Sequence, residues 1–401
     1  MAPRKILESA VIPNRHAIVT YKGKRAGLLS EIGPDTRFVY DAGWTQDIAC
    51  TLPSTTREHF WRNGLIPFFE HLGPEGWLRG HQARAGGTPD QDDFGLLLNY
   101  GADCIGAVGI LPEDGTHVHP IPDADPVEAA ATAPGRTLSG VQKKWLVYRN
   151  EQRFEPSIRA GDPATHIAKF NRVDQPTLVQ NEDLSLRLAR EVLGKEEVTA
   201  AAIGTVRGED GVALIVERFD RLGEVRLRLE DFAQILGRPR GREFDGKYNA
   251  SYEEAAAVIT RHSARALIDL GRFFRLVAFN LVIGNADAHL KNFSLLERDG
   301  GLRLSPAYDL LNTIVYPHYE RHTALAIDGE KRAFEDLHRD LVVALGVSIG
   351  LPRRAVDGAL QQLAKRFANA RALDVPPYAQ PNDFRVRYRD VVLDNAERIL
   401  K

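Results

Sequence analysis

The chain has 401 residues and a formal net charge of −2, with 26% charged and 43% hydrophobic residues. This composition is ordinary for a folded protein of two or three domains or subdomains, and the near-zero charge gives no sign of a nucleic-acid partner for the chain as a whole. Its two cysteines, Cys50 and Cys104, exclude a disulfide framework and a zinc site made only of cysteines. No stretch has the length of a transmembrane helix, and the N-terminus lacks the apolar run of a secretory signal. We therefore expect a cytoplasmic protein with no membrane contact.

The first part of the chain, residues 1–130, is predicted to form a β-rich subdomain. Polar and apolar residues alternate over 17–48, with a hairpin-type turn at Lys22-Gly23-Lys24. Apolar residues at helical spacing over 57–72 favour one helix or two short ones, and 112–134, rich in Pro, Asp, Gly and Ala, is expected to be a linker. A further helix is expected at 92–100 and a further strand at 107–111.

A small antiparallel sheet with one helix packed on it is expected within residues 131–236. The order of elements is strand, strand, helix, strand, strand. They are expected at 144–148, 166–170, 181–193, 200–206 and 212–218. We expect this region to resemble the N-lobe of a kinase, with a phosphate loop and a hinge.

Helices dominate the remainder, and residues 237–401 are predicted to form a helical C-terminal lobe. Helices are expected at 229–236, 252–262, 267–283, 334–345, 353–372 and 384–400, with a β-like pair at 293–296 and 302–304. A β-rich lobe followed by a helical lobe is the layout of a two-lobed phosphotransferase. The predicted fold class is therefore α+β: a bilobal, protein-kinase-like fold with an N-terminal β-rich subdomain and an all-helical C-terminal lobe.

The stretch 284–296, GNADAHLKNFSLL, crowds an acid, a histidine, a lysine and an amide between an apolar helix and a strand. An Asp followed five positions later by an Asn, here Asp287 and Asn292, has the spacing of a kinase catalytic loop. Asp and Asn are common, so the spacing alone is a weak signal. Its weight depends on whether the chain also supplies a nucleotide site.

Phosphoryl transfer from ATP requires positioned phosphates, cations that neutralise their charge, and an oriented acceptor hydroxyl. Asp287 is the candidate base for the hydroxyl, and Asn292 and Asp309 are the candidate Mg²⁺ ligands. Lys169, near the end of an apolar strand, is the candidate for the phosphates. Each residue also has a simpler interpretation, as an edge-strand lysine, a helix N-cap or a turn amide. The order Lys, Asp, Asn, Asp, each at the end of an element, favours the functional interpretation.

Two further residues of the polar loop, His289 and Lys291, could stabilise the transferred phosphoryl group. An equally good interpretation of His289 is a hydrogen bond to the loop backbone alone. Both residues are therefore candidates for the site.

The segment TLSGVQKK, residues 137–144, could hold phosphate through backbone N–H groups around Gly140 and through Lys143 or Lys144, although a plain turn explains it as well. Glu217 and Phe219 follow an apolar strand, at the place where a hinge backbone would meet an adenine. A charged strand end is the simpler interpretation.

Eight segments, in order from about residue 17 to the C-terminal helices, resemble the HipA family, the serine/threonine kinase toxins of HipBA toxin–antitoxin modules. They are TYKGKRAGLLSEIG, CIGAVGILPEDG, LSGVQKKWLV, THIAKF, NEDLSLRLAREVLG, IVERFDR, GNADAHLKNFSLL and LSPAYDLLNT. The resemblance implies a bilobal kinase fold with an N-terminal β-rich extension, dependence on ATP and Mg²⁺, and phosphorylation of a protein serine.

The matching positions imply a role for each candidate residue. The catalytic residues would be Asp287, His289 and Lys291, and the metal ligands Asn292 and Asp309. The nucleotide-binding residues would be Gly140, Gln142, Lys143, Lys169, Glu217, Phe219 and Tyr308. Many family members inactivate themselves by phosphorylating a serine just before the phosphate loop. Thr137 holds that position here, and Ser139 is also close enough to be the acceptor.

The resemblance also implies partners. The usual partner is a small helix-turn-helix antitoxin that binds operator DNA, and the known targets are aminoacyl-tRNA synthetases. Two alternatives stay open: a small-molecule kinase on the same fold, and a catalytically weak or inactive corepressor that binds antitoxin and operator DNA. Direct DNA contact is conceivable through basic residues near the C-terminus, although a solvated helix face explains their charges more simply. These residues are Arg353, Arg354, Lys365, Arg366 and Arg371.

Overall fold

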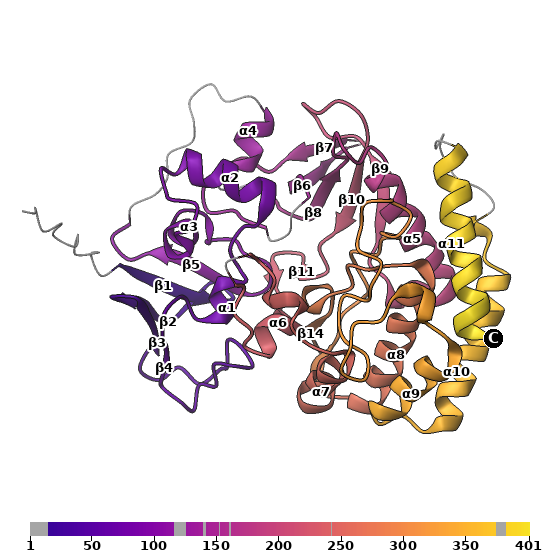
Figure 1. Ribbon diagram of the computed structural model, residues 1–401. Helices are drawn as coiled ribbons and strands as arrows, with labels where there is room; N and C mark the ends of the chain where they lie inside the picture. Colours follow the sequence, from indigo (N-terminus) through magenta and orange to yellow (C-terminus); the bar gives the residue numbers. More distant parts are fainter. Residues whose placement is uncertain are drawn as a thin grey trace, which may run out of the picture.

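A computed structural model describes residues 15–115, 126–138, 142–151, 153–159, 162–241, 243–373 and 382–401 of the chain. The N-terminal strands and short helices lie on the left of Figure 1 and the long helices on the right, with a second sheet above and between them. This arrangement confirms the predicted α+β class. The boundaries assigned to the domains at residues 130 and 236 stay a prediction.

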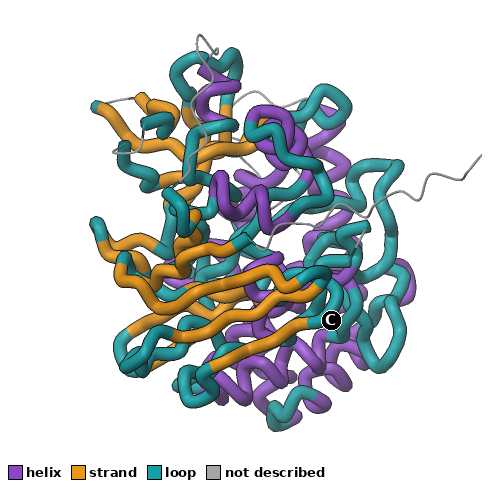
Figure 2. Tube along the Cα trace, turned by 90° about the vertical axis from the view of Figure 1, so that its left-hand side faces the viewer, coloured by secondary structure: helices purple, strands orange, loops and turns teal. Residues whose placement is uncertain are grey.

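The N-terminal sheet has five antiparallel strands in the order β4-β3-β2-β1-β5. They are β1 (His16–Tyr21), β2 (Lys24–Ile32), β3 (Asp35–Tyr40), β4 (Glu58–Trp61) and β5 (Val108–Pro112). Buried residues alternate along β1 and β3, as the sequence pattern predicts. Figure 2 shows this sheet as a layer with helices behind it.

The helix expected over 57–72 is wrong in its first half, because that part pairs with β3 as strand β4. Helical structure begins only at Pro67, in the short helix α1 (Pro67–Glu70), where proline occupies the first turn. Two other helices accompany the sheet, α2 (Gly76–Ala85) and α3 (Asp93–Tyr100). The expected linker 112–134 contains a further short helix, α4 (Pro126–Ala131).

The second sheet is also antiparallel, in the order β7-β6-β8-β10-β9. Its strands are β6 (Lys144–Asn150), β7 (Arg153–Pro156), β8 (His166–Phe170), β9 (Ala201–Gly204) and β10 (Ala213–Glu217). Helix α5 (Leu178–Val192) contacts β8, β9 and β10 and buries most of its residues. The predicted order of elements is confirmed, with β7 as the addition.

The helical lobe is built around α8, which buries twelve of its eighteen residues and contacts α7, α10 and α11. Its helices are α6 (Phe232–Ile235), α7 (Tyr252–His262), α8 (Ala266–Ile283), α9 (Arg339–Ser348), α10 (Arg353–Ala368) and α11 (Asn382–Leu400). Single 3₁₀ turns lie at Lys195–Glu197, Gly246–Tyr248, Leu290–Asn292, Phe334–Asp336 and Arg371–Leu373. None of the helices in the described ranges is both long and apolar enough to cross a membrane.

A small sheet adds strands to the lobe that was expected to be all-helical. It consists of β13 (Leu229–Asp231), β14 (Ser294–Arg298) and β15 (Gly301–Leu304), and a two-stranded ribbon, β11 (Arg221–Leu222) with β12 (Val225–Arg226), precedes it. The helix expected at 229–236 is therefore half strand, because its first residues pair with β14. The helix expected at 334–345 begins later, at Arg339, where the His338 side chain caps the first turn.

The N-terminal unit is hydrogen-bonded to the start of the helical lobe. The Cys50 N–H donates to the Glu230 carboxylate at 2.9 Å, and the Gln234 side chain donates to the Phe68 carbonyl at 2.9 Å. All four residues are at least partly buried. These contacts hold α1 and the start of α2 beside the polar loop that follows α8.

Candidate active site

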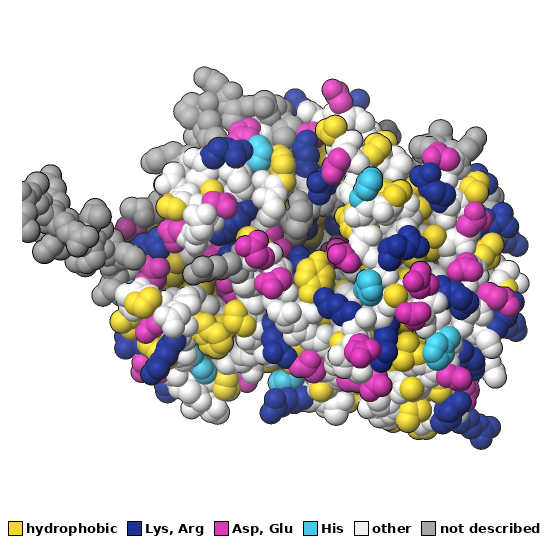
Figure 3. Space-filling model, viewed as in Figure 1, with side chains coloured by type: hydrophobic (Ala, Val, Ile, Leu, Met, Phe, Trp, Pro, Cys, Tyr) yellow, Lys and Arg dark blue, Asp and Glu magenta, His cyan; other side chains and the backbone are white. Residues whose placement is uncertain are grey.

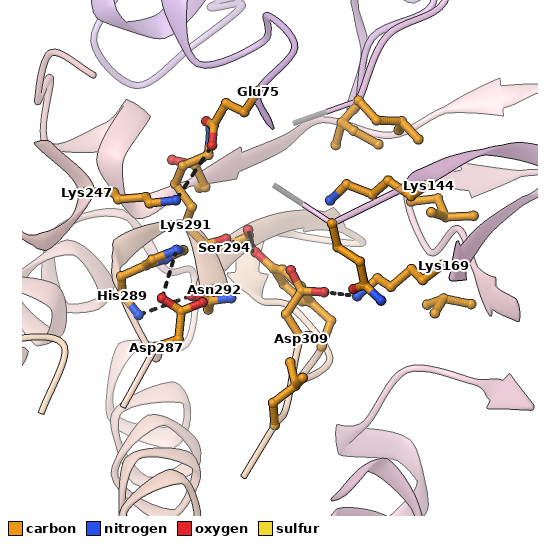
Figure 4. A pocket seen from close by; sticks show the side chains of 18 of the residues that line it. Glu75, Lys144, Lys169, Lys247, Asp287, His289, Lys291, Asn292, Ser294 and Asp309 are labelled. Carbon is orange, nitrogen blue, oxygen red and sulfur yellow. Dashed lines mark hydrogen bonds and ion pairs between the residues drawn. The ribbon is translucent and has the colours of Figure 1, made fainter. Parts of the chain in front are cut away.

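The main cavity is a cleft of about 390 Å³ that the second sheet and the helical lobe line together. Strands β6, β8 and β10 contribute to one side, and the loop after α8 and the segment after β15 contribute to the other. His71 and Glu75 add a contribution from the N-terminal unit. Figure 4 shows Lys144, Lys169 and Asp309 grouped at one end and Asp287, His289, Asn292 and Lys291 at the other.

Two lysines face the cleft from neighbouring strands. Lys144 of β6 and Lys169 of β8 are directly opposite in the antiparallel pairing, so their side chains share one face of the sheet. Both side chains are buried. Burial lowers the pKa of Lys144 to about 8, and the neighbouring Lys169 charge contributes to the shift while Asp309 opposes it. Two adjacent ammonium groups of this kind suit the phosphates of a nucleotide.

Lys169 is held by two carboxylates. Its ammonium group donates to Glu182 at 2.6 Å and to Asp309. Burial by itself would lower the pKa of Lys169, but Asp309 and Glu182 raise it above its ordinary value, so the lysine stays charged. Burial opposes ionisation of Asp309 as well, yet Lys169 and Lys144 hold the pKa of this carboxyl below its usual range.

Glu182 was not among the residues predicted from the sequence. It lies in the first turns of α5 and is only 1% exposed. A strand lysine followed by a helix that carries a glutamate is the signal that could have identified it, because kinases pair such residues across the lobe. Glu182 thus anchors Lys169 from helix α5.

The polar loop begins where α8 ends. Gly284 closes the helix in the left-handed conformation, with φ of 75°, and a side chain there would meet Ile314 at 2.6 Å. The Asn285 side chain then bonds to Asn280 at 2.7 Å and accepts the Asp287 N–H at 3.1 Å. These contacts present the Asp287 side chain to the cleft, where it is 44% exposed.

His289 and Asn292 form one turn of this loop. The His289 N–H donates to the Asn292 amide oxygen at 3.1 Å, and His289 Nε2 lies 3.9 Å from Asp287 Oδ1. Burial lowers the pKa of His289 to about 4, so the imidazole is neutral near pH 7. His289 therefore lies beside Asp287 without adding a charge.

Lys291 lines the cleft, but its ammonium group bonds to the N-terminal unit. It donates to Glu75 at 2.6 Å and lies 3.4 Å from the His71 carbonyl. Lys247 approaches the other oxygen of Glu75 at 3.6 Å. A carboxylate from the start of α2 thus fixes a lysine of the polar loop.

The backbone of Asp309 has a positive φ of 53°. This conformation is uncommon for a residue other than glycine, and it is often found at functional sites. Its neighbour Tyr308 donates to the Lys291 carbonyl at 2.9 Å and shares a short hydrogen bond with Ser294. The Tyr308 and Phe219 rings lie 5.6 Å apart at the cleft wall. Together they offer an aromatic surface suited to a base.

The hinge candidates are at the end of β10. Glu217 and Phe219 both line the cleft. The Glu217 N–H donates to Ala200 at 2.9 Å and the Arg218 N–H to Thr165 at 3.0 Å, so these two amides are engaged within the protein. Adenine recognition by the Glu217 amide is therefore not supported, whereas the Phe219 ring is available for stacking.

The predicted phosphate loop is only partly described. Gln142 lines the cleft and donates to the Phe170 carbonyl at 2.7 Å, while Gly140 and Ser139 lie outside the described residues. The structure does not bring Lys143 into the cleft. Side chains alternate along an extended chain, and Lys143 lies over the Trp145 ring at 5.0 Å and pairs with Glu209 at 2.9 Å. Lys144 lines the cleft, at the place expected for Lys143.

The hydroxyl of Thr137 is also outside the cleft lining. This side chain is buried and donates to the Gln82 side chain at 3.1 Å. In this conformation Thr137 is not exposed as an acceptor.

The donor set fits a magnesium ion. Asp309 supplies a carboxylate and Asn292 an amide oxygen, which has a second lone pair besides the one that His289 uses. Mg²⁺ binds through one or two such ligands and completes its shell with phosphate oxygens and water. Among the described residues, no cluster of three or more His, Cys, Asp or Glu side chains offers an all-protein site.

Comparisons with known proteins identify the family of the chain. A family model described as the HipA-like C-terminal domain matches residues 136–371, and one described as the HipA N-terminal domain matches 17–111. The chain therefore belongs to the HipA family.

Two relatives and one solved structure illustrate the similarity. A Sinorhizobium fredii protein named "Putative kinase Y4mE" is 30% identical over 83% of this chain and 86% of its own length. The serine/threonine-protein kinase toxin HipA of Shewanella oneidensis is 28% identical over 84% of each chain. A solved structure from Shewanella oneidensis, of HipA and HipB with operator DNA, superposes with a TM-score of 0.75 at 25% identity, covering 96% of this chain and 97% of the other.

Proposed function

We propose that this chain is a protein serine/threonine kinase that transfers the γ-phosphate of ATP to a protein hydroxyl. One observation supports the proposal most. A single cleft holds Lys169 and Asp309, which suit phosphates and a metal ion, together with Asp287, which suits an acceptor hydroxyl. Relatives that carry the name kinase add support.

Each cleft residue has a task in this proposal. Lys169 and Lys144 bind nucleotide phosphates, and Asp309 with Asn292 holds Mg²⁺, which offsets charge on the transferred group. Asp287 orients the acceptor hydroxyl and takes its proton as the new bond forms. Asp309 bonds to Lys169 through one oxygen, Oδ1, so its other oxygen would serve the metal ion, and Glu182 also holds the lysine.

We further infer that the kinase is the toxin of a toxin–antitoxin module. This rests on the Shewanella relative, named a kinase toxin, and on the structure of HipA with HipB and operator DNA. The partner would be a helix-turn-helix antitoxin, and an aminoacyl-tRNA synthetase is the expected target. DNA contact would be mainly through the antitoxin, and the face in Figure 3 has cationic and anionic side chains interspersed.

Two of the basic residues considered for direct DNA contact have partners within the protein. Arg353 pairs with Asp357 at 3.1 Å, and Arg366 donates to the Val192 carbonyl at 2.8 Å. These contacts favour a structural role for both arginines.

Phosphoproteomics after brief expression in a bacterium tests the proposed function. Wild type should arrest growth and produce new phosphoserine or phosphothreonine in one or a few proteins, including a synthetase. Asp287→Ala should abolish both effects, whereas Asp340→Ala, an exposed acid on α9, should leave them unchanged. The same new sites in the Asp287→Ala culture would contradict the proposal.

A further inference from the structure

Tyr248 holds the position at Asp287 that a substrate hydroxyl would need. Its hydroxyl donates to Asp287 Oδ1 at 2.5 Å, within the hydrogen-bond reach required between a general base and its proton donor. Among the described residues, Tyr248 is the one whose side chain donates a hydrogen bond to the Asp287 carboxylate. Tyr248 also lines the same cleft as Lys169 and Asp309.

The aromatic ring is fixed by its surroundings. It packs edge-on against His289, with ring centres 5.0 Å apart. The ammonium groups of Lys247 and Lys331 lie 5.4 Å and 5.3 Å from the ring centre. A phenol held in this way by a base and two cations has the surroundings of a bound acceptor rather than of a buried core tyrosine.

Burial and the nearby Asp287 charge raise the pKa of Tyr248 above its ordinary value. The phenol is therefore protonated at neutral pH, and it needs a base before its oxygen can attack phosphorus. Asp287 already accepts the hydrogen bond from that proton. Thr137, by contrast, is buried against Gln82 and outside the cleft lining.

We propose that Tyr248 is an intramolecular phosphoryl acceptor, a self-modification site that rests on the proposed kinase function. The Tyr248 oxygen forms a bond to the γ-phosphorus of ATP, and the bond from that phosphorus to the β-phosphate oxygen breaks. ADP leaves with the electron pair, and the phenol proton passes to Asp287.

The modification would alter access to the catalytic carboxylate. A phosphate adds about two negative charges near pH 7 and would repel Asp287, while Lys247 and Lys331 lie close enough to attract it. Movement of the phosphorylated ring away from Asp287 would free this position for a protein substrate.

The test is phosphopeptide mapping of the purified full chain after incubation with Mg-ATP. One phosphate should appear on the peptide that contains Tyr248, and Tyr248→Phe should lack it. Tyr148→Phe, which removes a phenol outside the cleft lining, should label like wild type. Asp287→Asn should slow the labelling at least about 100-fold, the usual scale for loss of a general base.

A mixing experiment distinguishes transfer within a chain from transfer between chains. Asp287→Asn chains of different mass, incubated with wild type, should stay unlabelled at Tyr248, and the wild-type rate should not depend on concentration. Label on the mutant chain would overturn the intramolecular assignment.

The result also separates this proposal from the proposed function. Phosphorylation of Thr137, Ser139 or another protein without label on Tyr248 would overturn the self-acceptor and leave the kinase intact. Absence of any label, together with absence of Mg-ATP binding in calorimetry, would overturn both.

Discussion

The charge on Lys144 depends on pH in a range close to neutrality. Burial lowers its pKa from 10.5 to about 8, so the ammonium group loses its proton as pH rises through about 8. The neighbouring Lys169 has a raised pKa and stays charged over the same range. The cleft therefore carries one cation fewer at pH 9 than at pH 7.

Mg-ATP should bind more weakly at high pH as a result. The charged fraction of Lys144 falls about tenfold between pH 7 and pH 9, and we expect the dissociation constant from calorimetry to rise by up to about tenfold. Lys144→Arg should remove this dependence, because arginine stays charged. Equal affinity of the wild type at both pH values would show that Lys144 does not bind the phosphates.

The neutrality of His289 also has a measurable consequence. Its folded-state pKa of about 4 is below the ordinary value of 6.5, so the unfolded chain binds a proton first as pH falls. This contribution to stability is complete above pH 6.5 and is lost between about 6.5 and 4. In urea titrations, His289→Gln should lose less stability than wild type between pH 7 and pH 5. An equal loss in both proteins would contradict the assignment.

At the scale of elements, the pairing of strands determines secondary structure and side-chain positions that local sequence leaves open. Lys143 and Lys144 are equivalent in a sequence pattern, but the pairing of β6 with β8 puts only Lys144 opposite Lys169. The segments that form β4 and β13 were predicted to be helical because their apolar residues also fit a helical period. Their pairing with β3 and β14 cannot be deduced from the local spacing of apolar residues. Periodicity predicted α7 and α8 well, because long buried helices have a strong pattern.

Helix α5 positions Lys169 through Glu182, and this contact should matter most when the metal is bound. Glu182→Gln removes the charge that holds the lysine once Asp309 binds the ion. We expect Mg-ATP to bind about tenfold more weakly, equivalent to about 1.4 kcal/mol. Glu191→Gln, on the same helix but not lining this cleft, is the control and should bind normally. Normal binding by Glu182→Gln would contradict this role.

At the scale of the whole molecule, the N-terminal unit contributes to the site itself. Glu75 is 2% exposed and pairs with Lys291 of the polar loop. Glu75 and Lys291 are 216 positions apart in the chain. Their contact depends on how the N-terminal unit packs against the helical lobe, which local sequence patterns do not reveal. Sequence spacing selected Lys169, Asp287, Asn292 and Asp309, which all line the cleft, whereas this pair and Glu182 required the three-dimensional structure.

Breaking the Glu75 contact should destabilise the protein. Glu75→Leu leaves Lys291 buried without this partner, which costs about 3–5 kcal/mol in the free energy of unfolding measured with urea. The pair of Lys22 with Glu297 also joins the N-terminal unit to the helical lobe, but its side chains are 34% and 32% exposed. Lys22→Met, which breaks this pair and leaves the bond from the Arg228 N–H to Glu297 in place, should therefore cost about 1 kcal/mol or less. Similar losses in the two variants would contradict the importance of the buried pair.

The central claim is that this cleft transfers phosphate from ATP with Asp287 as the base. The most direct measurement compares purified wild type and Asp287→Asn for Mg-ATP affinity and for the initial rate of transfer from labelled ATP to protein. We expect affinities that agree within about threefold and a rate at least about 100-fold lower for Asp287→Asn. Equal rates in the two proteins, or a wild type that does not bind Mg-ATP, would contradict it.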